Sequence, residues 1–440
     1  VGDANPEQMA VWHDEAEAFA NEEHGDLGGA LAYFEPGTAR FDSLLNDITS
    51  KSSFLEGGSR IQDKSALYHL HGEKIFDTEF AKFTVGANGR IYTPKSEGAL
   101  FSDTGGVTII NREFGVYAGL EKRFKEDEWI LKASMRLDKN ENFNFLPSPA
   151  LSLIWQPNKE HSLRATLTSA IRNPTLLNQY MYYNVGRAKL VGNISGYDSL
   201  VTIESLRDYY YTQNPDTLSY FNLDPIAPEE VKSIEVGYRG VLFKNLYVDM
   251  NYYFNSYTNF IGYTTGADIT ILQSGFVVND VYRIATNSRE TITTQGATVG
   301  LNYYLGDHYA INGNYSWNVL NKESDDPIIP AYNTPENKFN IGFRGRDLAI
   351  KKFNGFGFNV NYKWIQGFIF EGSPQFTGSV PTYGLLDAQI NKRIDKANLT
   401  IKIGASNLLN NQVLQVYGGP FVGRMIYTSL SFDWKDKNNK

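Results

Sequence analysis

The 440-residue chain contains 42% hydrophobic residues, 14% aromatic residues and 39 glycines, a usage that suits β-strands. Its formal net charge of -8 excludes the basic footprint of a nucleic-acid-binding protein, so we expect no nucleic-acid partner. The absence of cysteine excludes disulfides and thiolate metal sites. The sequence contains no run of about eighteen apolar residues, so it predicts no transmembrane helix.

The first 64 residues carry a helix signal. In NPEQMAVWHDEAEAFANEE, Asn5 is a suitable cap, Pro6 fits the first helical position, and helix-forming residues follow. We therefore expect residues 1–64 to be a partly helical segment ahead of the first strand. Because the chain begins at Val1 without an initiator methionine or a signal peptide, we interpret it as the mature or truncated remainder of a longer protein.

From residue 65 onward, apolar and polar residues alternate in many short runs. In AKFTVGANGRIY, residues 81–92, a strand would turn one set of side chains to each face. The apolar set is Phe83, Val85 and Ile91, and the polar set is Lys82, Thr84, Asn88 and Arg90. Similar runs lie near residues 65–73, 113–121, 129–137, 151–155, 163–168, 234–239, 246–252, 297–303, 311–318, 338–344, 356–364, 386–391, 399–405 and 425–434. The pattern predicts about fifteen strands of the length that a membrane barrel uses.

The connections between these runs alternate between short and long. Tight polar turns are expected at residues 125–128, 157–160, 243–245, 306–308 and 395–396. Long segments separate them at 172–230, which is the largest, and at 258–291, 320–337, 366–383 and 407–423. Short turns at one end and long loops at the other are typical of an outer-membrane barrel. We therefore expect an all-β, transmembrane antiparallel β-barrel whose apolar face contacts lipid.

The strand count predicts a barrel wall that this chain does not close. An odd number of antiparallel strands cannot complete a bacterial barrel, and about 15 strands are expected of the 22 found in the large transporter class. We therefore expect residues 65–434 to be the C-terminal portion of the barrel, with 65–73 and 425–434 not paired to each other. Residues 1–64 would then be extracellular, and residues 435–440 a periplasmic tail.

Three local sequences resemble a known family. SLRATLTSAIRNPT contains Arg172 and Pro174, IAPEEVKSIEVGYRG contains Pro228, Glu229, Glu235 and Gly237, and ASNLLNNQ contains Asn407. The closing run RMIYTSLSFDW, residues 424–434, ends in aromatic residues. In this order and spacing they resemble the TonB-dependent outer-membrane receptors abundant in Bacteroidetes.

The resemblance implies a function and several partners. Members of that family capture a ligand outside the cell, and periplasmic TonB drives uptake by pulling on an N-terminal plug that occludes the barrel. Expected partners are therefore the plug and early barrel strands, TonB acting through the plug, the lipid bilayer, and in some members a surface lipoprotein lid. The plug itself is absent from these 440 residues. The family carries iron chelates, cobalamin, glycans and peptides, and the sequence does not choose among them.

The longest predicted loop contains a concentration of tyrosines. We identify as candidate ligand contacts Tyr180, Tyr182, Tyr183, Arg187, Tyr209, Tyr210, Tyr211 and Tyr220. Tyrosine combines a large rigid face with a hydroxyl group, which suits recognition of sugars, peptides or chelates. The alternative interpretation is that these rings pack the loop against its neighbours.

Other patterns do not predict an enzyme, a metal site or a cofactor. DKNENFN, starting at Asp138, has Phe143 where a calcium loop needs glycine. His69 and His71 share a strand face without a neighbouring carboxylate in the pattern, which favours a structural pair over a metal site. Two other classes stay open: a passive channel or porin, which needs no plug, and a cell-surface β-sheet binding protein, which would stay monodisperse without detergent.

Overall fold

The computed structural model describes residues 11, 36–51, 56, 58–186, 188–272, 275–321, 328, 332–351, 353–372 and 377–433. Most of the helix predicted within residues 5–23 lies outside the described residues, as do Arg187 and the tail 435–440. A helix, α2 (Ala39–Ser50), does lie within the N-terminal segment, where the Thr38 side chain caps it by accepting a hydrogen bond from the Phe41 amide. Among the described residues, no helix is both long and apolar enough to cross a bilayer.

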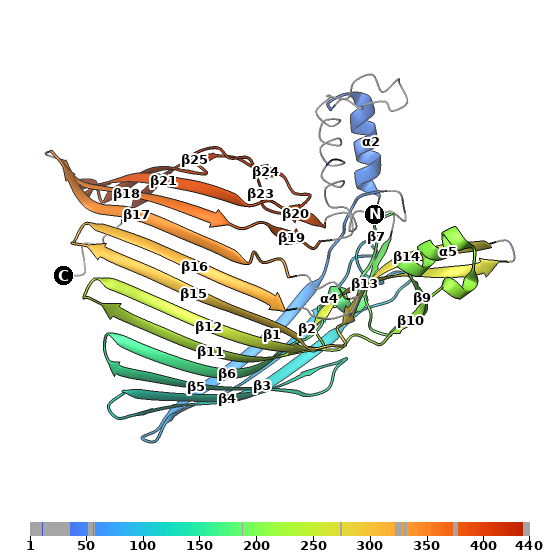
Figure 1. Cartoon of the computed structure of the whole chain (residues 1–440), viewed down its shortest axis with the longest axis horizontal. Coiled ribbons are helices and arrows are strands. Elements are labelled where there is room, and N and C mark those ends of the chain that lie inside the picture. The colour runs from blue at the N-terminus through green and yellow to red at the C-terminus, as the bar shows by residue number, and fades with distance from the viewer. Residues whose placement is uncertain are drawn as a thin grey trace.

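One curved sheet of fifteen strands dominates the structure (Figure 1). In spatial order its strands are β1 (Ala66–Asp77), β2 (Lys82–Thr93), β3 (Asn111–Phe124), β4 (Trp129–Asn140), β5 (Leu146–Asn158), β6 (His161–Arg172), β11 (Glu229–Leu242), β12 (Leu246–Thr258), β15 (Ile292–Leu305), β16 (Tyr309–Asn321), β17 (Asn337–Ile350), β18 (Phe353–Ile365), β21 (Tyr383–Ile394), β22 (Leu399–Ser406) and β25 (Met425–Phe432). Neighbours are antiparallel throughout. The predicted all-β fold is confirmed.

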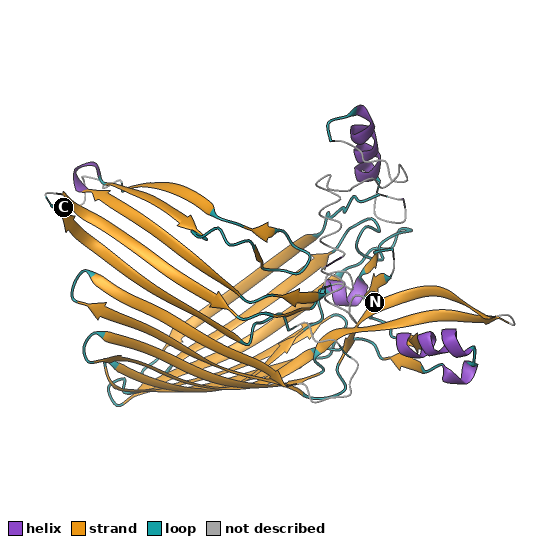
Figure 2. Ribbon diagram, turned by 45° about the horizontal axis from the view of Figure 1, so that its top comes forward, coloured by secondary structure: helices purple, strands orange, loops and turns teal. Residues whose placement is uncertain are grey.

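The two edges of this sheet are β1 and β25, which do not pair with each other. That arrangement agrees with the expectation for residues 65–73 and 425–434. Both edge strands are long, and every residue of each is exposed. The sheet is therefore an open, curved wall, as Figure 2 also shows.

Short and long connections lie at opposite ends of the wall. The tight turns gather at one end with the C-terminal part of the chain, and the long loops gather at the other (Figure 1). At the turn after β3, Lys125, Glu126 and Asp127 all have positive φ, as a tight reversal requires. Residues 94–110, between β2 and β3, form a further long connection. The sequence pattern did not predict this connection.

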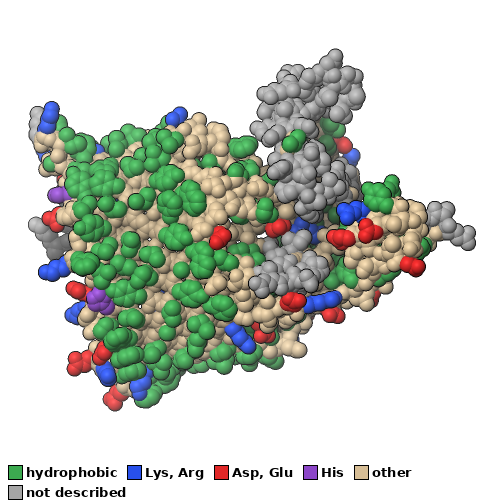
Figure 3. Space-filling view, in the orientation of Figure 1, with side chains coloured by type: hydrophobic (Ala, Val, Ile, Leu, Met, Phe, Trp, Pro, Cys, Tyr) green, Lys and Arg blue, Asp and Glu red, His purple; other side chains and the backbone are tan. Residues whose placement is uncertain are grey.

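The outer face of the wall is apolar and the inner face polar. In β2, Phe83, Val85 and Ile91 are exposed, whereas Thr84, Asn88 and Arg90 on the opposite face are partly buried. Side chains on the concave face of a curved sheet converge, which accounts for this difference. Figure 3 shows hydrophobic side chains spread over the wall and many charged ones near its ends. Exposed apolar surface on this scale is what a lipid-facing barrel needs.

Two of the long loops build a second sheet at the loop end. Its six strands, in order, are β10 (Tyr220–Leu223), β9 (Tyr197–Thr202), β13 (Ile261–Leu272), β14 (Gly275–Asn287), β8 (Lys189–Val191) and β7 (Tyr182–Asn184). Helices α4 (Leu176–Tyr180) and α5 (Ile203–Thr212) and the turn η1 (Pro215–Thr217) belong to the same loops. We call this unit the loop sheet. The remaining short elements are β19 (Phe368–Phe370) with β20 (Gly378–Val380), β23 (Val413–Leu414) with β24 (Phe421–Val422), and η2 (Asp395–Ala397).

A small hydrophobic core holds the loop sheet together. Val191, Leu200 and Ile284 are at most 3% exposed and come from β8, β9 and β14. Tyr182, Tyr197, Phe221, Leu223 and Tyr282 pack around them. Segments 173–228 and 259–291 therefore form one folded body instead of two independent loops.

Candidate functional site

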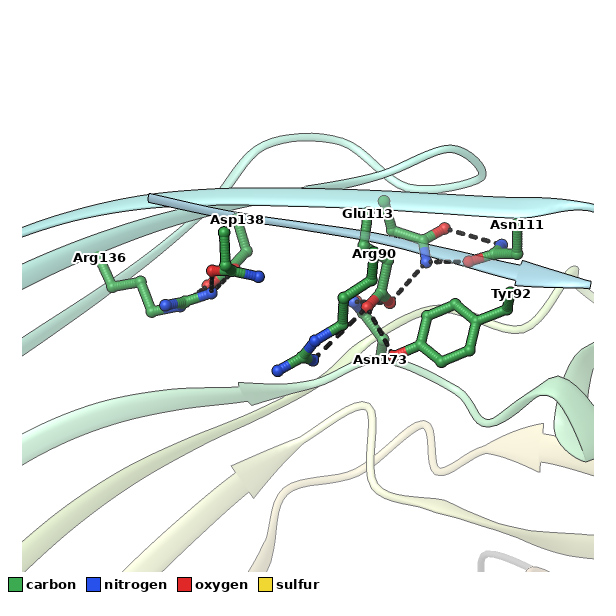
Figure 4. A network of polar contacts seen from close by, with 9 residues as sticks. Arg90, Tyr92, Asn111, Glu113, Arg136, Asp138 and Asn173 are labelled. Atoms are coloured by element: carbon green, nitrogen blue, oxygen red, sulfur yellow. Dashed lines mark hydrogen bonds and ion pairs between the residues drawn. The ribbon is translucent and has the colours of Figure 1, made fainter. Parts of the chain in front are cut away.

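A polar network lies on the inner face of β2, β3 and β4 near the loop end (Figure 4). The register sets Arg90 opposite Glu113, and Glu113 opposite Asn140, so the three side chains converge. Asn140 donates from Nδ2 to Glu113 Oε1 at 2.8 Å, and the Tyr92 hydroxyl donates to Glu113 Oε2 at 3.2 Å. The Asn173 amide, from the large loop, also donates to Glu113 at 3.1 Å. The Glu113 carboxylate thus connects the barrel wall to the start of the loop sheet.

A hollow of about 460 Å³ lies beside this network on the inner face. Its lining includes His69, His71, Arg90, Tyr117 and Arg136. His71 Nε2 lies 2.8 Å from the Tyr117 hydroxyl, which donates to Glu73 at 2.7 Å. The His69 and His71 rings are 6.4 Å apart. Within the described residues, no three His, Cys, Asp or Glu side chains are placed to hold a metal ion.

Ion pairs join many of the charged side chains on the inner face from β2 to β12. They are Arg90 with Glu113 (3.8 Å), Arg123 with Glu121 (2.8 Å), Lys132 with Glu121 (3.0 Å), Arg136 with Asp138 (2.5 Å), Arg164 with Glu235 (3.3 Å), Arg172 with Glu229 (2.7 Å) and Arg239 with Asp249 (3.0 Å). Each pair joins side chains that alternation places on the same polar face. We call this part of the wall the paired wall.

The motif residues Arg172 and Glu229 form the junction between the barrel wall and the loop sheet. Glu229 is 6% exposed, and its Oε2 accepts from Arg172 Nη2 at 2.7 Å and from the Ile261 amide at 2.8 Å. One buried carboxylate therefore links the end of β6, the start of β11 and the start of β13. The Asn287 side chain closes the same junction by bonding both backbone groups of Ala227 and the carbonyl of Asn259.

The other motif residues also shape connections. The carbonyl of Pro174 accepts from Gln179 at 2.7 Å, and that of Pro228 accepts from Asn259 at 3.4 Å. Glu235 pairs with Arg164, whose side chain lies across Gly237 so closely that a Cβ there would be 2.7 Å from Arg164 Nε. A larger residue at this position would therefore have to displace the Arg164 side chain.

Asn407 organises the last long loop. It is 4% exposed, has a φ of 50°, and donates from Nδ2 to the Asn411 carbonyl at 2.6 Å. Its backbone amide donates to Asp387 at 2.8 Å, which ties the loop to the inner face of β21. Asparagine tolerates the left-handed region and bonds the backbone locally, so it suits this turn.

The structure separates the candidate tyrosines into two groups. Tyr182 packs on the core of the loop sheet, and Tyr209 is 4% exposed with its ring 5.1 Å from that of Phe276. Tyr210, Tyr211 and Tyr220 are 64%, 76% and 52% exposed. The first group contributes to packing, and the second is solvent-exposed, with the Tyr210 and Tyr211 rings 5.5 Å apart in an edge-to-face arrangement.

Tyr180 contacts the end of the barrel wall, whereas Tyr183 belongs to the loop sheet. The Tyr180 hydroxyl accepts from Asn142 Nδ2 at 2.6 Å, beside the polar network, and Tyr183 is half-buried in β7. Glu113 and Arg136 lie within the alternating runs 113–121 and 129–137, and the sequence pattern gave neither of them a role. Their convergence depends on the register between strands, which alternation within one strand does not specify.

Charge also stabilises the loop sheet away from the wall. Lys189 Nζ lies 2.6 Å from Asp280 Oδ1, and this hydrogen-bonded carboxylate raises the pKa of Lys189. Burial, with Asp280 alongside, raises the pKa of Tyr282 to about 12. Both side chains therefore keep their protons at neutral pH, and the Lys189 cation stays paired.

The junction makes a specific prediction. We expect Glu229→Gln to loosen the loop sheet, because the amide loses the ion pair with Arg172 at a buried position where an orphaned partner costs about 1 to 3 kcal/mol. Amide hydrogen exchange should rise about tenfold or more across β13 and β14 and stay unchanged in β2 and β3. Glu230→Gln, at the neighbouring position, is the matched control. Equal exchange in both variants would contradict this role for Glu229.

The comparisons with known proteins agree with this geometry. The family model described as TonB dependent receptor-like, beta-barrel matches residues 15–408. The chain belongs to this family. A comparison with curated protein sequences finds no match.

Several solved structures share the fold. The siderophore receptor PirA from Acinetobacter baumannii aligns with a TM-score of 0.59 at 15% identity, covering 86% of this chain and 57% of that one. The FrpB iron transporter from Neisseria meningitidis (F5-1 variant) gives 0.58 at 14%, covering 83% and 55%. The copper transporter OprC gives 0.59 at 13%, covering 85% and 57%. The chain thus spans a little over half the length of these proteins, and the likeness is one of fold.

Proposed function

We propose that the chain forms the C-terminal part of the barrel of an outer-membrane transporter that takes up a scarce ligand with energy from TonB. The observation that carries the proposal is the fifteen-stranded wall, apolar outside and polar inside, in a chain of the TonB-dependent receptor family. In this proposal residues 1–64 are extracellular, residues 65–434 form the barrel portion, whose strands cross the membrane and whose long loops are extracellular, and residues 435–440 are periplasmic.

The proposed partners follow from the two free edges. Unpaired backbone groups in hydrocarbon each cost several kcal/mol, so β1 and β25 need neighbouring strands. About seven early barrel strands would supply them, and a plug domain that TonB engages would occupy the lumen. A surface lipoprotein lid over the loop end is a further proposed partner. We propose no enzymatic activity and no cofactor.

Uptake by intact cells tests the proposal. The full-length protein, expressed in a Gram-negative host that lacks its own receptors, is offered iron-55-loaded enterobactin, labelled cobalamin, a labelled oligosaccharide and a labelled peptide. We expect saturable accumulation of one probe that stops when TonB is deleted or the proton gradient is collapsed. Accumulation that persists without TonB would contradict active transport and favour a passive channel.

The exposed tyrosines of the loop sheet are the proposed ligand contacts. Replacing both Tyr210 and Tyr211 by alanine should weaken binding of the transported probe about tenfold, because aromatic anchors at an interface are worth roughly 1 to 2 kcal/mol or more. Equilibrium binding to purified protein measures the change. Tyr303→Ala, an exposed ring on the outer face of β15, is the control. Unchanged affinity in the double variant would show that the ligand binds to other residues and not to Tyr210 and Tyr211.

A further inference from the structure

Charged side chains on the outer face of the wall lie toward its two ends, and the two ends differ. Because side chains alternate along each strand, those that share a face with the exposed Val85 can be followed across the register. Near the loop end they have both signs and comprise Arg112, Lys139, Glu230 and Lys232. Near the turn end, wherever the ladder of the described strands is regular, they are all lysines, namely Lys74, Lys122 and Lys392.

Two of these lysines are held over aromatic rings. Lys122 Nζ lies 3.4 Å from the centroid of the Phe80 ring, in the turn between β1 and β2. Lys392 Nζ lies 4.4 Å from that of Phe356, directly across on β18, and donates to the Asn354 carbonyl. Within the described chain, neither ammonium group lies within ion-pair distance of a carboxylate. A ring and a carbonyl hold the cation in place without neutralising it, so each site can still attract an anion.

Both lysines have described strands on either side. Lys122 is on β3, between β2 and β4, and Lys392 is on β21, between β18 and β22. The additional strands of the proposed transporter would join the wall at β1 and β25, and its plug would lie against the inner face. Neither would cover the outer face of β3 or β21, which is left to the bilayer. Lys74 lies on the edge strand β1, which an added strand would adjoin, so we leave it out of the site.

The positions of the two lysines along their strands suit the edge of a bilayer. Lys122 is three residues from the turn that begins at Lys125, and Lys392 is three residues from η2, which begins at Asp395. At about 3.3 Å per residue and a strand tilt of about 40°, this is roughly 8 Å of depth, which a lysine side chain can nearly span. The residues directly across from them, Leu131 and Ile401, are apolar and would contact acyl chains.

We propose that Lys122 and Lys392 each bind the headgroup phosphate of an anionic glycerophospholipid of the periplasmic leaflet. In each site the ammonium group contacts the phosphate, the phenylalanine ring beneath it fixes its depth, and the apolar side chain across from it packs against an acyl chain. Lysine at a membrane surface favours anionic over zwitterionic lipid, which supplies the selectivity. The proposal rests on the lipid-facing outer face and the periplasmic turn end of the proposed function, but not on uptake of any ligand.

Local quenching by brominated lipids tests this inference. The full-length protein carries a bimane fluorophore on a single cysteine, either Leu131→Cys beside Lys122 or Ile401→Cys beside Lys392. It is reconstituted into equal mixtures of dioleoylphosphatidylglycerol and dioleoylphosphatidylcholine, with bromine on the acyl chains of one lipid or of the other. The ratio of the two quenching efficiencies gives the relative occupancy of the two lipids beside the label. We expect phosphatidylglycerol to be preferred about fivefold at both positions.

Ile311→Cys is the matched control position. It lies on the outer face of β16, also three residues from a turn, and its neighbours across the two adjacent strands are Tyr303 and Phe343. We expect both lipids to quench a label there equally. A preference of the same size at Ile311→Cys, or none at Leu131→Cys and Ile401→Cys, would overturn the inference.

Charge variants show whether the lysine itself is responsible. Lys122→Gln should abolish the preference at Leu131→Cys, and Lys122→Arg should preserve it. Lys132→Gln removes the same charge from the paired wall on the inner face and should leave the preference unchanged. A preference that survives Lys122→Gln would contradict the site. Because the measurement needs no transport, its failure is distinct from a failure of the uptake test.

Discussion

Val236→Arg is expected to destabilise the folded barrel by about 2 to 4 kcal/mol, the cost of a cation on the lipid face near the bilayer midplane. Val236 lies near the middle of β11 on the outer face and is 47% exposed. Its neighbours across the two adjacent strands are Ala165 and Tyr252, so no carboxylate faces it there. Urea titration of the full-length barrel refolded into lipid vesicles measures the change.

A matched substitution on the inner face separates lipid contact from general damage. Thr166 lies on the neighbouring strand, faces inward, and is directly opposite Glu235. Thr166→Arg places the same side chain in a polar lumen, where we expect a change of less than about 1 kcal/mol. If both variants lose the same stability, or if Val236→Arg loses none, the outer face does not contact lipid.

Ile284→Ala is expected to disrupt the loop sheet while the barrel wall stays folded. Ile284 is fully buried in β14 against Val191 and Leu200, and truncating such a side chain costs about 2 to 5 kcal/mol. Because the buried core has only three residues in the described part of the chain, this loss is large compared with the free energy that holds the loop sheet folded. Limited proteolysis should cut within segments 173–228 and 259–291 together, because both depend on the same core, and uptake of the transported probe should fall with it.

The control for Ile284 lies on the same strand. Val277 is another branched aliphatic residue of β14 but is 49% exposed, so Val277→Ala removes no core contact. We expect its proteolysis pattern to match that of the unmodified protein. Cleavage of segment 173–228 without cleavage of 259–291 in Ile284→Ala would show that the two loops fold independently.

The fold of the wall could be predicted because its signals are local. Alternation of apolar and polar residues decides which face of each strand is wet, and the turns at residues 125–128 and 306–308 are short enough to fix hairpin partners. The expected all-β fold with about fifteen antiparallel strands agrees with the fifteen-stranded sheet. The sequence also identified Arg172 and Glu229 as motif positions, but it did not predict the contact between them.

The loop sheet could not be predicted because its pairings are non-local. Lys189 to Val191 pair in parallel with Tyr282 to Ile284, over ninety residues away in sequence, and nothing in either segment specifies the other. Segment 258–291 was treated as a loop, yet it contains the twelve- and thirteen-residue strands β13 and β14. β13 does alternate, with Ile261, Ala267 and Ile269 on one face and Gly262, Gly266 and Asp268 on the other, so its strand character is local, whereas its pairing with β9 is not.

The orientation of the wall is tested most directly by spin labels along β2 of the full-length protein in lipid vesicles. Labels at Phe83, Val85 and Ile91 should relax with oxygen, which concentrates in lipid, and labels at Thr84, Asn88 and Arg90 with a water-soluble nickel complex. The two sets should alternate residue by residue along the strand. Nickel access at the first set and oxygen access at the second would place the apolar face inward and contradict the membrane barrel on which the proposed transport depends.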